Sequence, residues 1–222
     1  MNGPRELRLS TTPSAAAIAE LRLGDVIYLD GLMYTAREGV YKRALEDKAN
    51  IPMDLPMDSA ANFHCSPAAR INDNGSFDMG AVTATASFRF RKWLPDWMSK
   101  TGTRLIVGKG GMTSDDYKEY FVPNGAVYLS TVGYGTGALL GRGIERVEAV
   151  HWNEELGLAQ AMWVIKCSKM GPFMVASDLD GNCLFERENA KIARNIAKVY
   201  EGTSPAVLKR YGETDNPADE VI

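Results

Sequence analysis

A glycine-rich turn that carries one lysine, Gly108-Lys109-Gly110-Gly111, offers the clearest chemistry in this sequence. It follows residues 105–107, three apolar β-formers that predict a short buried strand. Glycine permits a tight turn and a close approach of the backbone to a ligand. Lys109 has no carboxylate beside it in the sequence. A lysine at the end of a buried strand is typical of α/β proteins that bind a small anion there.

Arg37 is a second candidate for binding an anion. Thr35 and Glu38 have the spacing of a capping box, which predicts a helix that begins here with Arg37 in its first turn. A cation is unfavourable at this end of the helix dipole, whereas the free backbone N–H groups there attract anions. The local sequence leaves two interpretations open, a residue of an anion site or a surface arginine.

The order of the expected elements predicts how these residues are held. Strands are expected at residues 25–29, 60–65, 105–107 and 126–132, and a hairpin at 162–167 and 173–177. Helices are expected at residues 35–47, 88–101, 113–121 and 137–147, with a charged helical tail from residue 188. Strands that alternate with helices predict an α/β fold with a mixed sheet and flanking helices.

Composition excludes several classes of partner. The chain has 222 residues, 45% of them apolar, and a net charge of −3 with no run of Lys or Arg, so neither nucleic acid nor an anionic membrane is expected as a partner. No apolar stretch reaches the roughly 18 residues that a membrane span requires. The first ten residues lack the apolar core of a signal peptide, so a cytoplasmic protein is expected.

The cysteines predict no metal site on this chain. Cys65, Cys167 and Cys183 are far apart, no CxxC pair occurs, and only His64 and His151 could assist them. Buried, reduced thiols are therefore expected. Both histidines follow or precede an aromatic residue, which favours a buried supporting role over that of a catalytic base.

Three other stretches resemble known ligand-binding motifs but do not match them fully. Five residues separate Gly102 from Gly108, where a P-loop has four, and Gly110 stands where a P-loop has Ser or Thr. Residues 133–138 match the dinucleotide pattern GxGxxA, but no strand ending in a ribose-binding acid follows about 20 residues later. Residues 178–182 resemble a calcium loop but lack its final glutamate, so a hairpin turn is predicted.

Several stretches, taken in their order and spacing, resemble one protein family. They are LGDVIY at 23–28, YTARE at 34–38, FHCSP at 63–67, IVGKGGM at 106–112, GAVYL at 125–129, VHW at 150–152, LG at 156–157, AMWV at 161–164 and GPF at 171–173. The sequence resembles the β subunit of two-subunit class I fumarases and L-tartrate dehydratases, a unit that is also the C-terminal domain of single-chain class I fumarases. The resemblance covers roughly residues 6–190.

This resemblance implies a swivelling β/β/α domain over residues 1–190, followed by a C-terminal helical tail at 191–222. It implies a hydro-lyase that adds water to, or removes it from, a C4-type dicarboxylate. In the family, a [4Fe–4S] cluster ligated by three cysteines of an α subunit serves as the Lewis acid. The expected partner is therefore a cluster-bearing α subunit, in an α2β2 hetero-oligomer, and no cofactor is expected on this chain alone.

The resemblance also assigns roles to four residues. Arg37 matches the arginine of the family's T-x-R-[DE] turn, which binds a substrate carboxylate. Lys109 matches the lysine of the GKG turn, which faces the substrate. Thr85 and Arg89 match the threonine and arginine of a segment usually written GPTT-x-x-R-M. That threonine is the proposed base element, working with an aspartate of the α part, and that arginine is a further carboxylate ligand.

Residues 80–91 depart from the family pattern. The proline is absent, Phe88 precedes the arginine, and Phe90 replaces the usual methionine. A shifted alignment to the family segment would select Thr83 in place of Thr85 and Arg91 in place of Arg89. Fumarate/malate, tartrate and a substituted fumarate all remain open as substrates. A non-catalytic dicarboxylate-binding or assembly module that retains the fold is the alternative, and a nicotinamide enzyme is a third hypothesis.

Overall fold

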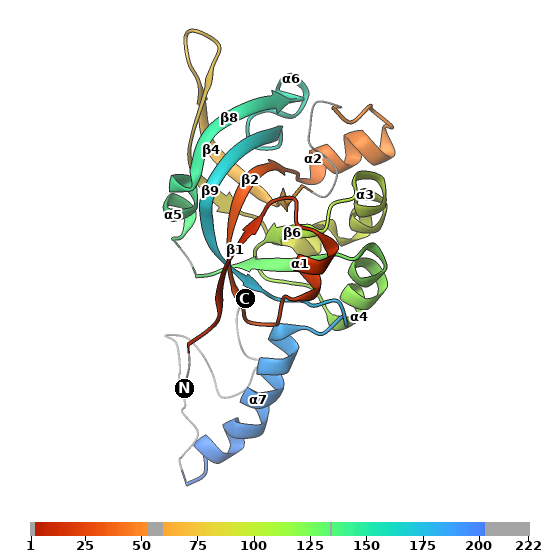
Figure 1. The fold of residues 1–222 in the computed structure, drawn as a ribbon, viewed down its shortest axis with the longest axis vertical. Coiled ribbons are helices and arrows are strands. Elements are labelled where there is room, and N and C mark those ends of the chain that lie inside the picture. The colour runs from red at the N-terminus through yellow and green to blue at the C-terminus, as the bar shows by residue number, and fades with distance from the viewer. Residues whose placement is uncertain (1–2, 53–59, 134, 203–222) are drawn as a thin grey trace, which may run out of the picture. The chain divides into compact units, whose positions relative to one another are not determined.

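The computed structural model describes residues 3–52, 60–133 and 135–202 (Figure 1). Contacts divide the chain into two compact units, Met1–Arg187 and Glu188–Ile222. Helix α7 (Leu184–Val199) crosses this division. The predicted division into a family domain at 1–190 and a helical tail at 191–222 stays a prediction, and residues 203–222 of that tail lie outside the described part.

A seven-stranded mixed sheet forms the first unit. Its strands, in spatial order, are β1 (Glu6–Ser10), β2 (Val26–Thr35), β3 (Asn62–Phe63), β6 (Leu105–Gly108), β7 (Val127–Thr131), β9 (Met162–Val175) and β8 (Ile144–His151). The first five are parallel, and β9 runs antiparallel to β7, to β8 and also to β2. The pairing of β9 with β2 closes a barrel-like ring, and the expected mixed α/β class is confirmed.

Both faces of the central strands are buried, which explains their continuous apolar sequence. Leu105 and Val107 of β6 belong to one core cluster, inside the curved sheet, while Ile106 between them belongs to a second cluster under the helices. Strand β7 alternates in the same way, with Val127 in the first cluster and Tyr128 in the second. Side chains of a strand point alternately to its two faces, so each such strand serves two cores.

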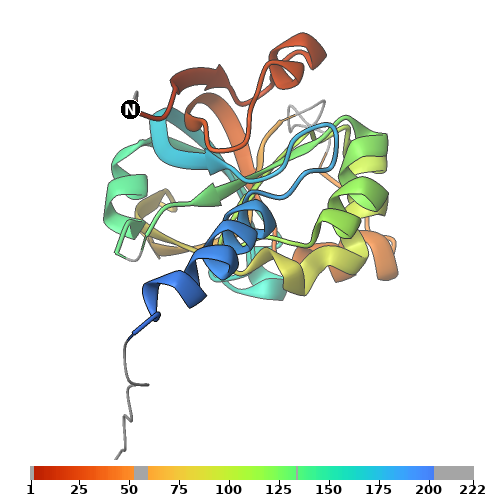
Figure 2. The ribbon, with the colours of Figure 1, turned by 90° about the horizontal axis from the view of Figure 1, so that it is seen from below.

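Short helices flank this sheet. They are α1 (Ala15–Ala19), α2 (Glu38–Tyr41) with a π-helical turn (Lys42–Glu46), a 3-10 turn (Ser87–Trp93) leading into α3 (Leu94–Thr101), α4 (Ser114–Asp116) with a π-helical turn (Tyr117–Phe121) and a 3-10 turn (Val122–Asn124), α5 (Gly137–Arg142) and α6 (Asn153–Leu156). Figure 2 shows α3 and α4 on one side of the sheet and α5 on the other. Pro95 lies in the first turn of α3, and Gly102 ends that helix in a left-handed conformation, as the sequence predicts.

Three expected boundaries are wrong. Strand β2 continues beyond its predicted end at residue 29, and Gly31 within it adopts a positive φ of 131°, while the extra residues of the irregular pairing here lie on β9. Strand β9 likewise runs through the predicted hairpin, because its pairing with β2 continues on both sides of the local turn signal at Gly171. Helix α5 ends at Arg142 rather than near residue 147, and strand β8 follows it at once.

A β-hairpin extends beyond the sheet (Figure 1). Its strands are β4 (Cys65–Ile71) and β5 (Phe77–Ala84), joined by a turn around residues 72–75. Helix α5 packs on β5 through two glycines four residues apart, which lie on one helix face. A Cβ atom at Gly137 would lie 2.9 Å from the carbonyl oxygen of Val82, and one at Gly141 would lie 2.3 Å from that of Gly80.

We expect Gly141→Ala to destabilise the domain by about 1–3 kcal/mol, because the added methyl group must push α5 away from a backbone atom that cannot yield. Gly80→Ala is the matched control, since its Cβ would meet only the Ala68 carbonyl oxygen at 3.5 Å. Its effect on the free energy of unfolding should stay within about 1 kcal/mol. Urea unfolding of both variants tests this, and equal losses would show that α5 does not require glycine at its contact with β5.

Candidate functional site

Two of the predicted site residues, Arg37 and Lys109, follow parallel strands at one edge of the sheet. Thr35 of β2 pairs with Phe63 of β3, which pairs in turn with Val107 of β6. Arg37 and Lys109 each stand two residues beyond their strand's paired position, so they lie on the same edge. Neighbouring strands are about 4.8 Å apart, which separates these two backbone positions by roughly 10 Å. This carboxyl edge is where α/β sheets bind their ligands.

Lys109 is held against the segment that contains Thr85. An isolated parallel bridge joins Ala86 to Lys109. The Lys109 N–H donates to the Thr85 carbonyl at 3.0 Å, and the Ser87 N–H donates to the Lys109 carbonyl at 3.3 Å. Gly110 adopts a φ of 73° with open space around it, so this glycine makes the turn and leaves the exposed lysine at its tip. The structure thus brings together two segments that the sequence selects separately.

Arg37 occupies the residue before helix α2 rather than its first turn, and the predicted capping box is wrong. The Thr35 hydroxyl points instead to strand β9, where it donates to the Ala161 carbonyl and accepts the Trp163 N–H. The Arg37 guanidinium donates from Nη1 to the Ala159 carbonyl at 2.9 Å. Its Nε is buried and has no hydrogen-bond partner among the described residues.

The two candidate arginines of residues 87–93 face different neighbours. Arg89 is exposed, and its charge contributes to lowering the pKa of the Glu38 carboxyl, behind the larger effect of the hydrogen bond from Lys42. Arg91 instead lies 3.7 Å from the Asp116 carboxylate of α4. Arg89 therefore lies toward the start of α2, where Arg37 stands, and Arg91 does not.

A cavity of about 300 Å3 opens beside Lys109. It is lined by hydroxyl-bearing and small residues: Val82, Thr83, Ala84, Lys109, Thr131, Gly133, Gly135, Thr136, Gly137 and Ala138. Of the four predicted site residues, only Lys109 lines it, while Thr85, Arg37 and Arg89 do not. The alternative threonine, Thr83, lines it as well. Thr131 and Thr136 are lining residues that the sequence analysis did not single out.

The glycine run at 133–137 does not open a dinucleotide-binding unit in this fold. Strand β7 precedes it and α5 follows it, but the next strand, β8, pairs only with β9 and runs antiparallel to it. A dinucleotide-binding unit needs a second parallel strand after the helix. Gly133, Gly135, Thr136 and Gly137 of this run instead line the cavity beside Lys109.

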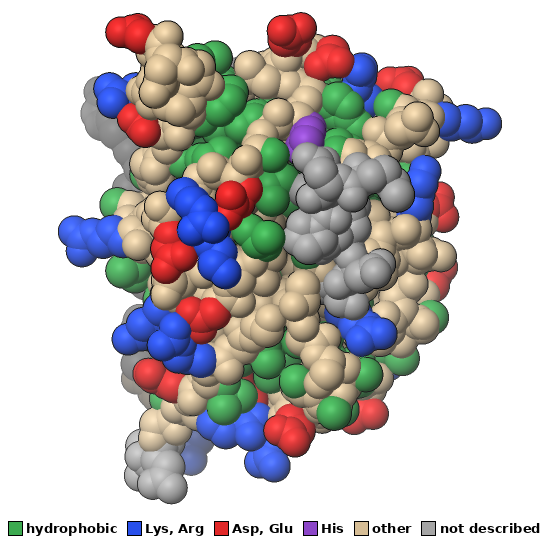
Figure 3. Space-filling view, turned by 45° about the horizontal axis from the view of Figure 1, so that its top comes forward, with side chains coloured by type: hydrophobic (Ala, Val, Ile, Leu, Met, Phe, Trp, Pro, Cys, Tyr) green, Lys and Arg blue, Asp and Glu red, His purple; other side chains and the backbone are tan. Residues whose placement is uncertain are grey.

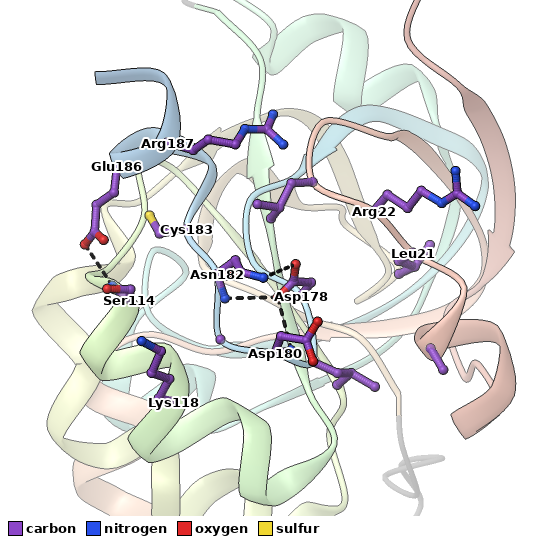
Figure 4. Close-up of a pocket in the computed structure, with 14 residues that line it drawn as sticks. Leu21, Arg22, Ser114, Lys118, Asp178, Asp180, Asn182, Cys183, Glu186 and Arg187 are labelled. Atoms are coloured by element: carbon purple, nitrogen blue, oxygen red, sulfur yellow. Dashed lines mark hydrogen bonds between the residues drawn. The ribbon is translucent and has the colours of Figure 1, made fainter. Parts of the chain in front are cut away.

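A larger cavity, of about 1060 Å3, lies at another place in the first unit (Figure 4). Its walls come from residues 19–23, from α4 and the π-helical turn after it, and from residues 178–187, which include the first turn of α7. The Asp178 carboxylate there accepts the backbone N–H groups of Asp180 and Asn182, and Glu186 accepts that of Ser114. Asp178 therefore stabilises the loop itself and Glu186 joins α7 to α4, and none of the predicted site residues lines this cavity.

A chain of buried polar side chains lies beneath the Lys109 turn. Asn62 donates to the Tyr41 hydroxyl at 2.7 Å, and that hydroxyl lies 2.7 Å from His64 Nε2. His64 Nδ1 lies 2.7 Å from Ser87 Oγ, which lies 2.8 Å from the Tyr128 hydroxyl. All five side chains are fully buried. Burial lowers the pKa of His64 to about 3, so the imidazole is neutral.

The cysteines are separate from this network. Cys65, Cys167 and Cys183 are buried free thiols, and burial raises the pKa of Cys65 and of Cys167. Within residues 3–52, 60–133 and 135–202, no group of three or more His, Cys, Asp or Glu side chains could hold a metal ion. In the same residues, no helix is long and apolar enough to cross a membrane.

The surface carries both signs of charge. Figure 3 shows basic and acidic side chains intermixed over the visible face, with apolar side chains between them. In the described part of the chain, Arg5, Arg8, Arg43 and Arg70 are each paired with a carboxylate. Arg37, Arg89 and Lys109 form no ion pair there, which leaves three cations at one edge of the sheet available for an external anion.

Comparison with known proteins identifies the family. The family model "Fumarase C-terminus" matches residues 2–188. The chain is 34% identical to the L(+)-tartrate dehydratase subunit beta of Escherichia coli (strain K12) over 188 residues, 83% of this chain and 89% of that relative. It is 33% identical to the putative L(+)-tartrate dehydratase subunit beta of Methanocaldococcus jannaschii over 81% of this chain and 91% of that relative.

A putative fumarate hydratase class I of Geobacillus stearothermophilus is 33% identical over 82% of this chain, which spans 34% of that longer relative. The chain belongs to the Fumarase C-terminus family. The family resemblance found in the sequence is thereby confirmed.

The neutral His64 makes stability depend on pH. Its pKa is about 3 in the folded protein and about 6.5 when exposed, so the unfolded chain binds more protons between these values. The neutral imidazole contributes fully to the free energy of unfolding above pH 6.5, and this contribution is lost as the pH falls toward 3. Lowering the pH from 7 to 5 should therefore reduce the free energy of unfolding by about 2 kcal/mol.

NMR of the histidine side chains tests this prediction directly, because the chain has only two histidines. The His64 ring signals, assigned with a His64→Gln variant, should not shift between pH 8 and pH 5. A midpoint near 6.5 would contradict the burial of a neutral imidazole.

Proposed function

We propose that this chain is the β subunit of a hydro-lyase that hydrates or dehydrates a C4-type dicarboxylate in a site shared with an α subunit. The substrate class is fumarate/malate or tartrate/oxaloacetate. Membership of the Fumarase C-terminus family supports the reaction class. The names of the relatives, tartrate dehydratase subunit beta and class I fumarate hydratase, support both the substrate class and an α partner.

The observation that carries this proposal is the set of cations at the carboxyl edge. Arg37 follows β2 and Lys109 follows β6 on that edge, and Arg89 lies toward the start of α2. Within the described residues, none of the three has a carboxylate partner of its own. A dicarboxylate carries two negative groups, and guanidinium groups pair with them through two parallel hydrogen bonds.

The residues would divide the work as follows. Arg37 and Arg89 bind the carboxylates and fix the substrate's orientation. Lys109 faces the substrate and stabilises the negative charge that develops as the C–H proton leaves. Thr85 takes part in proton transfer together with a carboxylate of the α subunit, because a hydroxyl alone is a weak base.

The iron–sulfur cluster belongs, on this proposal, to the α subunit. The described residues of this chain do not fit such a group, since their three thiols are buried apart and no set of three ligands converges. We also propose that the domain has the swivelling β/β/α organisation of its family, that residues 1–190 form it, and that the assembly is an α2β2 complex in the cytoplasm.

Reconstitution tests the function. The chain purified alone should show no hydratase activity, and anaerobic mixing with an α subunit that carries the cluster should restore turnover of L-tartrate or of fumarate and malate. The ratio of the two rates identifies the substrate. Binding of dicarboxylates without turnover would favour the non-catalytic module, and full activity of the isolated chain would refute the shared site.

Substitution of Lys109 should separate catalysis from folding. In the reconstituted enzyme, Lys109→Ala should lower kcat about 100- to 1,000-fold, because a cation directed at developing charge is lost. Its stability should stay close to that of the wild type, since the side chain is exposed at the tip of a turn. Lys100→Ala, an exposed lysine in the last turn of α3, is the control and should keep full activity.

Paired substitutions decide which threonine and which arginine of residues 83–91 act in the site. Thr85→Val and Arg89→Ala should lower kcat/KM far more than Thr83→Val and Arg91→Ala, because Thr85 is joined to the Lys109 backbone and Arg91 faces Asp116. Steady-state kinetics of the four variants gives the comparison. The opposite order would move the catalytic role to Thr83, which lines the cavity beside Lys109.

A further inference from the structure

We propose that Tyr128, Ser87 and His64 are positioning residues of the site, which hold the Lys109 turn and the Thr85 segment in their working geometry through buried hydrogen bonds. This inference rests on the proposed function for its kinetic consequence. Its structural consequence can be measured on the chain alone.

The network connects segments that are distant in sequence. His64 follows β3, Ser87 follows β5, and Tyr128 lies in the middle of β7. The Tyr128 hydroxyl lies 2.8 Å from Ser87 Oγ and 3.2 Å from the Lys109 carbonyl oxygen. One phenol therefore contacts both the segment that carries Thr85 and the turn that carries Lys109.

The number of available protons determines the direction of these hydrogen bonds. Asn62 donates to the Tyr41 oxygen, so the Tyr41 proton is free to go to His64 Nε2. A neutral imidazole then carries its proton on Nδ1 and donates it to Ser87. The Tyr128 hydroxyl donates to Ser87 Oγ from the other side, and it also lies within hydrogen-bond distance of the Lys109 carbonyl oxygen.

In this arrangement Ser87 Oγ accepts from both neighbours, and the Tyr128 hydroxyl also contacts the backbone of the predicted catalytic turn. With the other imidazole tautomer, Ser87 would donate to His64 and His64 would donate to Tyr41. The Tyr41 proton would then have no acceptor in the described part of the network, which is costly for a fully buried hydroxyl.

The space around Gly108 also shows that the network contacts the turn directly. A Cβ atom at this position would lie 2.0 Å from Ser87 Oγ, 2.9 Å from the Tyr128 hydroxyl and 3.2 Å from the Thr85 carbonyl oxygen. The last residue of β6 therefore lacks a side chain because the hydroxyl groups occupy that space. They contact the backbone next to Lys109 and not merely a distant part of the core.

The chain offers a matched control for a purely structural role. Tyr34 is also a fully buried tyrosine with a bonded hydroxyl, but its partners are Thr103 and Trp97 and none of them touches the Lys109 turn. Loss of either hydroxyl removes a buried hydrogen bond from the same domain. Only loss of the Tyr128 hydroxyl should change the geometry of the site.

In the reconstituted enzyme, Tyr128→Phe should lower kcat about 10- to 100-fold, because a small displacement of a positioned group has effects of this size. KM should change much less. Tyr34→Phe should keep the wild-type kcat while losing a comparable amount of thermal stability. Equal kcat values for both variants would overturn the inference.

Hydrogen exchange tests the same idea without any substrate. The Lys109 N–H is bonded to the Thr85 carbonyl, so its exchange rate reports the pairing of the two segments. Tyr128→Phe and, as a second variant, Ser87→Ala should accelerate exchange of this amide at least about tenfold more than Tyr34→Phe does. Unchanged protection in both would overturn the inference.

The two tests separate the inference from the proposed function. If the wild-type complex turns over no dicarboxylate, the proposed function fails, while hydrogen exchange still decides whether the network holds the turn. If the wild type is active and Tyr128→Phe matches it in kcat, the positioning role fails alone.

Discussion

The buried imidazole of His64 sets a strict requirement on the structure around it. A fully buried polar ring must find a partner for each nitrogen, and burial keeps the ring neutral. Its two partners, Tyr41 and Ser87, come from elements on opposite sides of it in sequence. Satisfying one side chain therefore ties the end of α2, the end of β3 and the segment after β5 to one another.

The closed sheet explains why the candidate site forms where it does. Strands β2, β3, β6 and β7 run parallel and side by side, so the residues that follow them gather at a single edge. Both faces of these strands are buried, which leaves that edge as the place where charged side chains can reach solvent. Arg37 and Lys109 stand there because the chain leaves the sheet at these points.

Local sequence predicts some of this architecture well and some of it not at all. The strand at residues 105–108, the glycine turn after it and helix α3 with its Gly102 end follow from local preferences. Strands β8 and β9 do not, because β9 pairs with β2 on both sides of the local turn signal at Gly171, and β8 pairs with β9 where local sequence predicts the end of a helix. The approximate place of the site is predictable from Lys109 and Arg37. The network under it is not, since its hydrogen bonds join residues 23 and 41 positions apart.

Charge balance adds a last argument about the site. The arginines that stabilise the fold have carboxylates of their own, as Arg5 has Asp25 and Arg43 has Glu155. Arg91, two residues after Arg89, faces Asp116 and is partly neutralised. Arg37, Arg89 and Lys109 form no ion pair within the described residues, although the Glu38 carboxylate interacts with the charge of Arg89, and mutual repulsion among cations destabilises an unliganded edge. An anionic ligand, or a carboxylate of a partner subunit, removes that repulsion, so this edge gains most in stability when it is occupied.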